Sequence, residues 1–227
     1  MRWGIASIVL SWSVGFVGCA SQLNKGPLYA GDAQGRATME VLPSLDVVDD
    51  ALTPEMRMAR MLCAESLELT PPVPPADTSA VQLTNWSDHQ LKPWLQEKQR
   101  RAEAARQELD RAAVQNHRQR IVSGALLGLV FEDVARDLLQ MPVPRELANE
   151  PEVADIFREV MMSQASPYLL HAKLAYKACA GNAGGLASMG HWSEFCSGRA
   201  ESLPQREPEP DGSDTTTVTV ERTTAAR

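Results

Sequence analysis

Four side chains between residues 171 and 196 are of the types that bind metals or form covalent cross-links. They are His171, Cys179, His191 and Cys196. Imidazole and thiolate groups can hold zinc together, but structural zinc sites space their ligands in short pairs such as Cys-x-x-Cys. The spacings here follow no recognised ligand pattern. The sequence therefore predicts no metal site, with zinc at these four residues as the alternative.

The cysteine count favours a disulfide. Three cysteines follow the first twenty residues: Cys63, Cys179 and Cys196. In an oxidising compartment three cysteines favour one disulfide and one spare thiol, and three pairings are possible. We prefer Cys179–Cys196, because it would join two consecutive helices across a Gly-rich turn and contribute on the order of 3 kcal/mol. Cys63 is then expected to be a buried, inert thiol.

Patterns typical of enzymes are missing. The run GNAGG at 181–185 follows an expected helix and not a strand, which indicates a turn instead of a phosphate-binding loop. No Cys-x-x-Cys-His haem motif and no Gly-x-Ser-x-Gly nucleophile motif occurs. The acid pair Glu132–Asp133 is expected on the exposed side of a helix. No catalytic residue and no cofactor is therefore predicted.

The first twenty residues have the layout of an export signal. Arg2 gives a positive start, residues 3–18 are uncharged and mostly apolar, and Cys19 follows. The run Phe16-Val17-Gly18-Cys19 resembles the lipobox of bacterial lipoproteins, with Phe16 in place of the usual Leu. The resemblance implies cleavage between Gly18 and Cys19, a diacylglyceryl group on the Cys19 thiol and acylation of the new amine.

A lipid anchor of this kind implies an address in the cell envelope. More than one acyl chain gives stable membrane attachment, whereas a single chain is marginal. Ala20-Ser21 lacks the Asp that resembles an inner-membrane retention signal in enteric bacteria, which favours the outer membrane. Two alternatives remain open. An ordinary signal could be cut after Ala20 to release a soluble periplasmic protein, or residues 3–20 could stay as an uncleaved anchor.

Composition limits the partners and the fold. The formal charge of −7 over 227 residues argues against general affinity for nucleic acid or anionic lipid. After residue 20 no stretch has the roughly 20 apolar residues of a membrane helix. Aromatic residues are only 5% of the chain, and an Ala-rich, aromatic-poor composition favours helices.

The pattern predicts a signal peptide at 1–18, a flexible tether at 19–51, a helical domain at 52–203 and a disordered tail at 204–227. Thr53, Pro54 and Glu55 suit the start of the first helix. Its apolar face is expected to include Met58, Met61, Leu62 and Cys63.

One unusually long helix is expected through 97–120, where Glu and Arg residues sit three and four apart. The pairs are Glu97–Arg101, Glu103–Arg106 and Glu108–Arg111. Leu95, Ala102 and Leu109 form a thin seam along it, with Ala105 and Ala112 between them.

The most core-like segment runs from Ile121 to Met141, with apolar residues on a wide helical stripe. That stripe comprises Ala125, Leu126, Leu129, Val130, Val134, Leu138 and Met141. Gly124 and Gly128 would allow a tight helix crossing. Parts of this segment and of 172–179 weakly resemble the two helices of a tetratricopeptide repeat, without a repeating period.

Three further helical stretches complete the domain. A helix from Pro151 to Met162 is expected to bury its larger apolar residues: Val153, Ile156, Phe157, Val160 and Met161. Pro167 is expected to break or kink the path, and the next helix to end near Ala180 with a left-handed cap at Gly181-Asn182. A short last helix is expected at 188–202.

These observations favour an all-α body of helical hairpins held at a membrane surface. The function that fits is a non-enzymatic lipoprotein acting as an adaptor or structural part of an envelope assembly, with an envelope protein as partner. Its contact surfaces would be the helix through 97–120 with its Glu–Arg pairs and the apolar stripe around Gly128, called the Gly128 stripe below. The alternative is a soluble periplasmic helical protein that binds a small ligand or metal.

Overall fold

Helices are the only regular secondary structure in the described part of the chain. The computed structural model describes residues 39–43, 52–76 and 79–204, and within them no strand occurs, which confirms the predicted all-α fold. The α-helices, in chain order, are α1 (Pro54–Glu68), α2 (Ala80–Trp86), α3 (Lys92–Ala113), α4 (His117–Leu139), α5 (Arg145–Ala148), α6 (Pro151–Ala183) and α7 (Gly190–Ser202).

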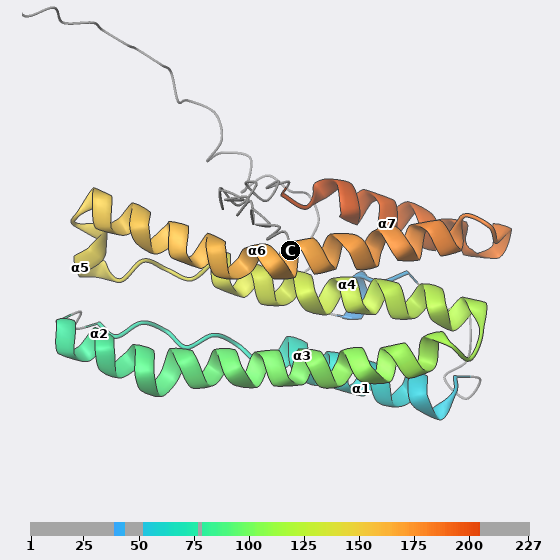
Figure 1. The fold of residues 1–227 in the computed structure, drawn as a ribbon, viewed down its shortest axis with the longest axis horizontal. Helices are drawn as coiled ribbons and strands as arrows, with labels where there is room; N and C mark the ends of the chain where they lie inside the picture. The colour runs from blue at the N-terminus through green and yellow to red at the C-terminus, as the bar shows by residue number, and fades with distance from the viewer. Residues whose placement is uncertain (1–38, 44–51, 77–78, 205–227) are drawn as a thin grey trace, which may run out of the picture.

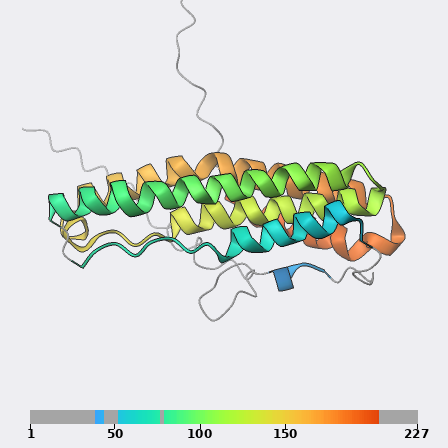
Figure 2. The same cartoon turned by 90° about the horizontal axis from the view of Figure 1, so that it is seen from below.

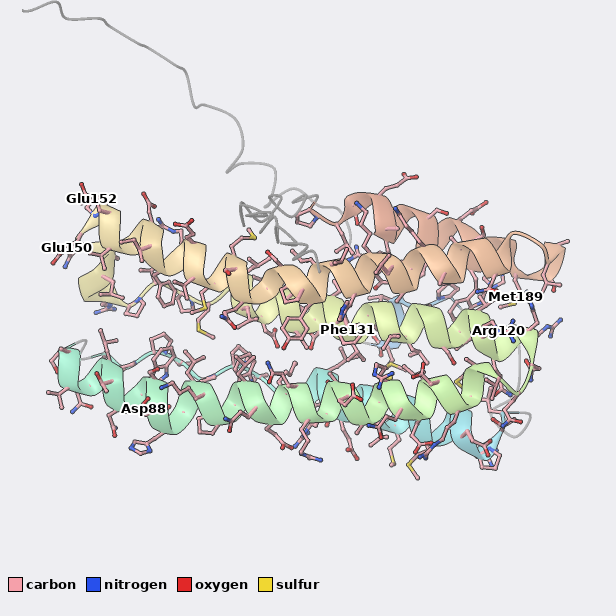
Figure 3. All side chains as sticks on the ribbon, in the orientation of Figure 1. Asp88, Arg120, Phe131, Glu150, Glu152 and Met189 are labelled. Carbon is pink, nitrogen blue, oxygen red and sulfur yellow. A yellow bond between two sulfur atoms is a disulfide. The ribbon has the colours of Figure 1, made fainter. Side chains whose placement is uncertain are left out.

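The long helices lie side by side in an elongated bundle (Figures 1 and 2). α1 and α3 pack together, α6 and α7 pack together, and α4 contacts all four of them. Asp88, Glu150 and Glu152 mark one end of the bundle, and Arg120 and Met189 mark the other (Figure 3). The apolar run of α4 suits this central place, because a helix that is apolar on nearly every side must be covered all round. No helix within the described ranges has both the length and the apolarity to cross a membrane.

The predicted tether is described only at residues 39–43. There the 3-10 turn η1 (Met39–Val41) packs against Leu67 of α1 and Leu129 of α4. This stretch therefore contacts the bundle instead of running free of it. The predicted signal segment, the remainder of the tether and the tail from residue 205 lie outside the described residues.

The start of α1 follows the sequence closely. The Thr53 hydroxyl accepts a hydrogen bond from the Met56 backbone N–H at 3.3 Å, and Pro54 occupies the first turn, where its missing N–H costs nothing. The buried face differs from the predicted one, because Met58 and Met61 are 46% and 48% exposed. The side chains that α1 buries are Met56, Ala59, Cys63, Ser66 and Leu67.

The predicted long helix through 97–120 is two helices. α3 ends at Ala113, and α4 begins at His117 after Asn116, whose side chain accepts a hydrogen bond from the Gln119 N–H at 2.9 Å. The chain reverses here without proline or glycine, so the capping asparagine is the one local signal for the break. The reversal makes α3 and α4 neighbours, and the predicted seam of Ala102, Ala105, Leu109 and Ala112 is buried between helices.

The helical path begins well before α3. α2 begins at Ala80, and a π-helical turn, η3 (Ser87–Leu91), joins it to α3. The Lys92 N–H donates to the Ser87 carbonyl, five residues back, and Pro93 has no N–H to donate. The wider turn therefore carries the chain past the proline without ending the helix.

α6 continues through Pro167, so the predicted break there is wrong. Pro167 is exposed, and the carbonyl of Ser163 that loses its partner lies on the solvent side of the helix. The predicted left-handed cap at Gly181-Asn182 is also wrong, because both residues lie inside α6. The helix ends at Ala183, and Gly184 is right-handed, with φ −60° and ψ −19°.

Gly124 and Gly128 bring α4 and α6 into direct contact, which confirms the predicted tight crossing. A Cβ atom at Gly128 would lie 2.6 Å from the Tyr176 ring, and one at Gly124 would lie 3.1 Å from the Cys179 Cβ. The Gly128 stripe is therefore an internal contact between two helices, and the prediction that it meets a partner is wrong.

Gly128→Ala is expected to destabilise the bundle by about 1–3 kcal/mol, because the Tyr176 ring must move and its surroundings are packed. Gly181→Ala is the matched control. It lies in the same pair of helices, its new methyl group would have no atom within 4 Å, and it should stabilise by roughly 0.5–1 kcal/mol. Urea denaturation followed by circular dichroism measures both. Equal effects of the two substitutions would contradict the close crossing.

Candidate functional site

The central helix α4 carries a row of buried charged side chains. Glu132 and Asp133 are 2% and 1% exposed, and Arg136 and Asp137 are 6% and 8% exposed. The prediction that the acid pair Glu132–Asp133 faces solvent is wrong, because neighbouring helices cover both sides of α4 where these two residues lie. Buried charges need partners, and these side chains divide into two clusters on opposite faces of α4.

The first cluster centres on Lys98 of α3, which is fully buried. Its ammonium lies 2.6 Å from Asp133 Oδ2 and 2.9 Å from Asp137 Oδ2. It also donates to the backbone carbonyls of Ser66, at 2.9 Å, and Leu69, at 3.0 Å. These carbonyls end α1, where unpaired C=O groups and the helix dipole favour a cation. One lysine therefore joins α1, α3 and α4.

The surroundings of Asp133 shift the pKa of its carboxyl group. Burial raises the pKa of Asp133 to about 6, the Lys98 ammonium acts in the opposite direction, the Asp137 carboxylate adds to the rise, and the Arg136 guanidinium lowers it. Arg136 pairs with Asp133 one turn away and lies 3.7 Å from Asp137. Two cations and two carboxylates thus balance each other inside the bundle.

The second cluster joins α4, α6 and α7. The Tyr176 hydroxyl donates to Glu132 Oε2 at 2.8 Å, and the Arg199 Nε donates to the same oxygen at 3.2 Å. A second nitrogen of Arg199 pairs with Glu132 Oε1. Tyr176 is fully buried and Arg199 is 5% exposed. The Tyr176 ring is also the group that rests on Gly128, so the tight crossing and this ion pair depend on each other.

These clusters connect the helices, and their charged groups are already engaged in pairing with one another. Each buried carboxylate described above already accepts from a cation, and the Lys98 ammonium has more acceptors than its three protons can serve. The sequence contains weak signals for these two clusters. Lys98 interrupts the Ala-lined seam of α3, and four charged residues follow the apolar run of α4.

A shallow pocket opens beside the Lys98 cluster. It has a volume of about 510 Å³ and lies between the Pro-rich segment after α1 and the end of α4. Its lining residues are Thr70, Pro71, Pro72, Val73, Asp137, Gln140, Met141 and Pro142. The pocket is mostly apolar, and its one carboxylate, Asp137, is already paired with Lys98. This pocket is the candidate for a small-molecule site in the part of the chain that the structure describes.

The predicted disulfide is confirmed. Cys179 of α6 and Cys196 of α7 are bonded, with their Cα atoms 6.0 Å apart. This uses two of the four residues considered for zinc, and no group of three or more His, Cys, Asp or Glu side chains in the described ranges is arranged to hold a metal ion. Cys63 is buried in α1, and burial raises the pKa of its thiol to about 12, as expected for an inert residue.

The outer face of α3 carries the predicted ladder of ion pairs. Glu97 pairs with Arg101 at 2.8 Å, Glu103 pairs with Arg106 at 2.6 Å, and Glu108 pairs with Arg111. Hydrogen bonds from Arg100 and Arg101 lower the pKa of Glu97 to about 2. Such exposed pairs contribute little stability each. Their main effect is that this face of α3 stays charged and solvated.

Comparison with known proteins gives no relative. No family model matches the chain, and neither a curated protein nor a solved structure matches it.

Proposed function

We propose that this protein is a lipid-anchored component of a bacterial cell envelope, held at the membrane through Cys19, whose helical bundle acts as a non-enzymatic scaffold or adaptor. The observation that carries the proposal is the run Phe16-Val17-Gly18-Cys19, placed where the apolar N-terminal segment ends. Its resemblance to a lipobox gives the cysteine a chemical role and the chain an address.

The Cys179–Cys196 bond supports an exported protein. Structural disulfides form and persist in oxidising compartments such as the periplasm, and thiols stay reduced in the cytosol. The bond joins α6 to α7 toward the end of the bundle opposite Glu152. Export through the N-terminal segment would place both cysteines where they can be oxidised.

The buried ion pairs support a scaffold. Lys98, Asp133 and Asp137 hold one side of α4, and Glu132 and Arg199 hold the other. Such clusters fix one arrangement of the helices, since any slip leaves a charge unpaired. A bundle of this kind presents fixed outer faces to a partner, and the outer face of α3 is polar and accessible.

A soluble periplasmic binding protein is the second candidate, and the pocket beside Asp137 is the observation in its favour. We rank it second because the pocket is open and its carboxylate is neutralised by Lys98. Ligand pockets in proteins bury most of their ligand and offer polar groups free to orient it.

Cys19→Ser is expected to abolish incorporation of a labelled fatty acid and to release the protein from the membrane fraction, because the thiol is the proposed attachment point. Cys63→Ala is the matched control: it also removes one thiol, but a buried one, and should leave labelling and fractionation unchanged. Labelling of growing cells followed by membrane fractionation measures both. A Cys19→Ser variant that stays labelled and membrane-bound contradicts the lipid anchor.

A further inference from the structure

The outer face of α6 exposes four large apolar side chains. Ile156 and Val160 are 59% and 48% exposed, and Leu170 and Leu174 are 51% and 54% exposed. The sequence predicted that Ile156 and Val160 face inward, and they do not. α4 ends at Leu139, so the first turns of α6 extend beyond it (Figure 1).

These side chains form one stripe, defined here as the α6 stripe. Ile156, Val160, Ser163, Pro167, Leu170 and Leu174 follow one another at steps of four and three residues. That alternation is the heptad spacing of a helix that packs lengthwise on another helix. The opposite side of α6 buries Ala165, Ala172 and Cys179 against the bundle. None of the described helices covers the stripe.

The charges beside the stripe indicate which helix fits it. Glu159 and Lys173 flank it on the same side, and neither has an ion-pair partner among the described residues. They lie 14 residues apart on one continuous helix, roughly 21 Å, so they cannot pair with each other. A helix that packs on the α6 stripe can pair with both charges.

A second copy of α6, running antiparallel, fits both the apolar spacing and the flanking charges of the α6 stripe. Ile156 and Leu174 are symmetric about residue 165, and so are Val160 and Leu170. Glu159 and Lys173 are symmetric about residue 166. An antiparallel copy therefore places apolar pairs on apolar pairs and Glu159 opposite the second copy's lysine, twice. In a parallel pair each flank of the stripe meets the opposite flank of the other helix, so Glu159 would not face the second copy's Lys173.

We propose that the α6 stripe is a self-association surface, through which two copies of this chain pair as antiparallel α6 helices about a two-fold axis that crosses the stripe at the level of residue 165. The interface is isologous: each copy uses the same patch, as in most homodimers. Ser163 and Pro167, whose side chains are small, lie at the two-fold axis, between the apolar pairs at the two ends of the stripe. The proposal does not depend on the lipid anchor.

Two full-length copies of the chain carrying different C-terminal tags test the proposal. They are expressed together and solubilised, one tag is captured, and the second is quantified. Leu170→Glu in both copies is expected to lower recovery of the second tag roughly tenfold, because it buries a charge in the apolar pair. Val114→Glu is the matched control, since Val114 is 74% exposed at the α3–α4 turn, and it should change nothing. Unchanged recovery with Leu170→Glu overturns the proposal.

Charge reversal separates a second copy from other occupants of the stripe. Glu159→Lys or Lys173→Glu alone creates two like-charge contacts across the axis and should lower recovery at least about threefold. The two reversals in one chain restore both pairs and should restore recovery. A different protein or a lipid surface would meet each charge separately, so a double variant as weak as the single ones overturns self-association. Circular dichroism checks that each variant folds.

Discussion

Lys98→Met is expected to lower the free energy of unfolding by about 3–5 kcal/mol. Methionine keeps most of the volume of the side chain but removes the ammonium. Asp133 and Asp137 would then share Arg136 alone, and the carbonyls of Ser66 and Leu69 would lose their common donor. Urea denaturation of the mature chain followed by circular dichroism measures the change.

Lys92→Met is the matched control for Lys98→Met. Lys92 lies on the same helix and pairs with Asp88 at 2.6 Å, but both side chains are exposed, so its loss should cost at most about 0.5 kcal/mol. A Lys98→Met variant as stable as the Lys92→Met variant would show that the cluster does not hold the helices.

The pH dependence of the Lys98→Met variant gives a second test of the cluster. Burial already raises the pKa of Asp133 to about 6, and removing Lys98 removes the group that acts most strongly against that rise. A carboxyl whose folded pKa lies above its unfolded value stabilises the fold at low pH and loses that contribution as pH rises through the folded pKa. The difference between the variant and the unsubstituted chain should therefore be smaller at pH 5 than at pH 7.

Arg199→Met should destabilise the bundle by a similar amount, about 3–5 kcal/mol, because within this cluster it leaves the buried Glu132 carboxylate with the Tyr176 hydroxyl in place of a cation. Adding Glu132→Gln removes the buried charge and should recover part of the loss. The same denaturation experiment measures both variants.

Arg158→Met is the control for Arg199→Met. Arg158 pairs with Asp155 on the surface of α6, with side chains 61% and 76% exposed, and its loss should be nearly neutral. If Glu132→Gln adds a further loss to Arg199→Met instead of relieving it, the buried charge is not the source of the destabilisation.

Local signals in the sequence predicted the parts of the fold that depend on neighbouring residues. Thr53 and Pro54 placed the start of α1, and the stripe from Ala125 to Met141 is buried as expected. The glycines at 124 and 128 predicted the close crossing of α4 and α6. In each case the physical cause, a cap, an apolar period or a missing Cβ, can be seen within a few residues.

The errors came from contacts between distant residues. Pro167 is tolerated because it lies on the exposed side of α6, and Ile156 is exposed because it lies on the same side, which faces away from the bundle. Glu132 and Asp133 are buried because Arg199 and Lys98, far away in sequence, neutralise them. A charged pair on a helix is usually solvated, and only the tertiary arrangement shows when it is not.

The mature N-terminus tests the proposed lipid anchor most directly. Mass spectrometry of the N-terminal peptide, from chain purified out of the membrane fraction, identifies both the first residue and its modification. A lipoprotein should yield a peptide that begins at Cys19 and carries a thioether-linked diacylglyceryl group on Sγ. A peptide that begins at Ser21, or one that retains residues 1–18 with an unmodified Cys19, would contradict the lipid anchor.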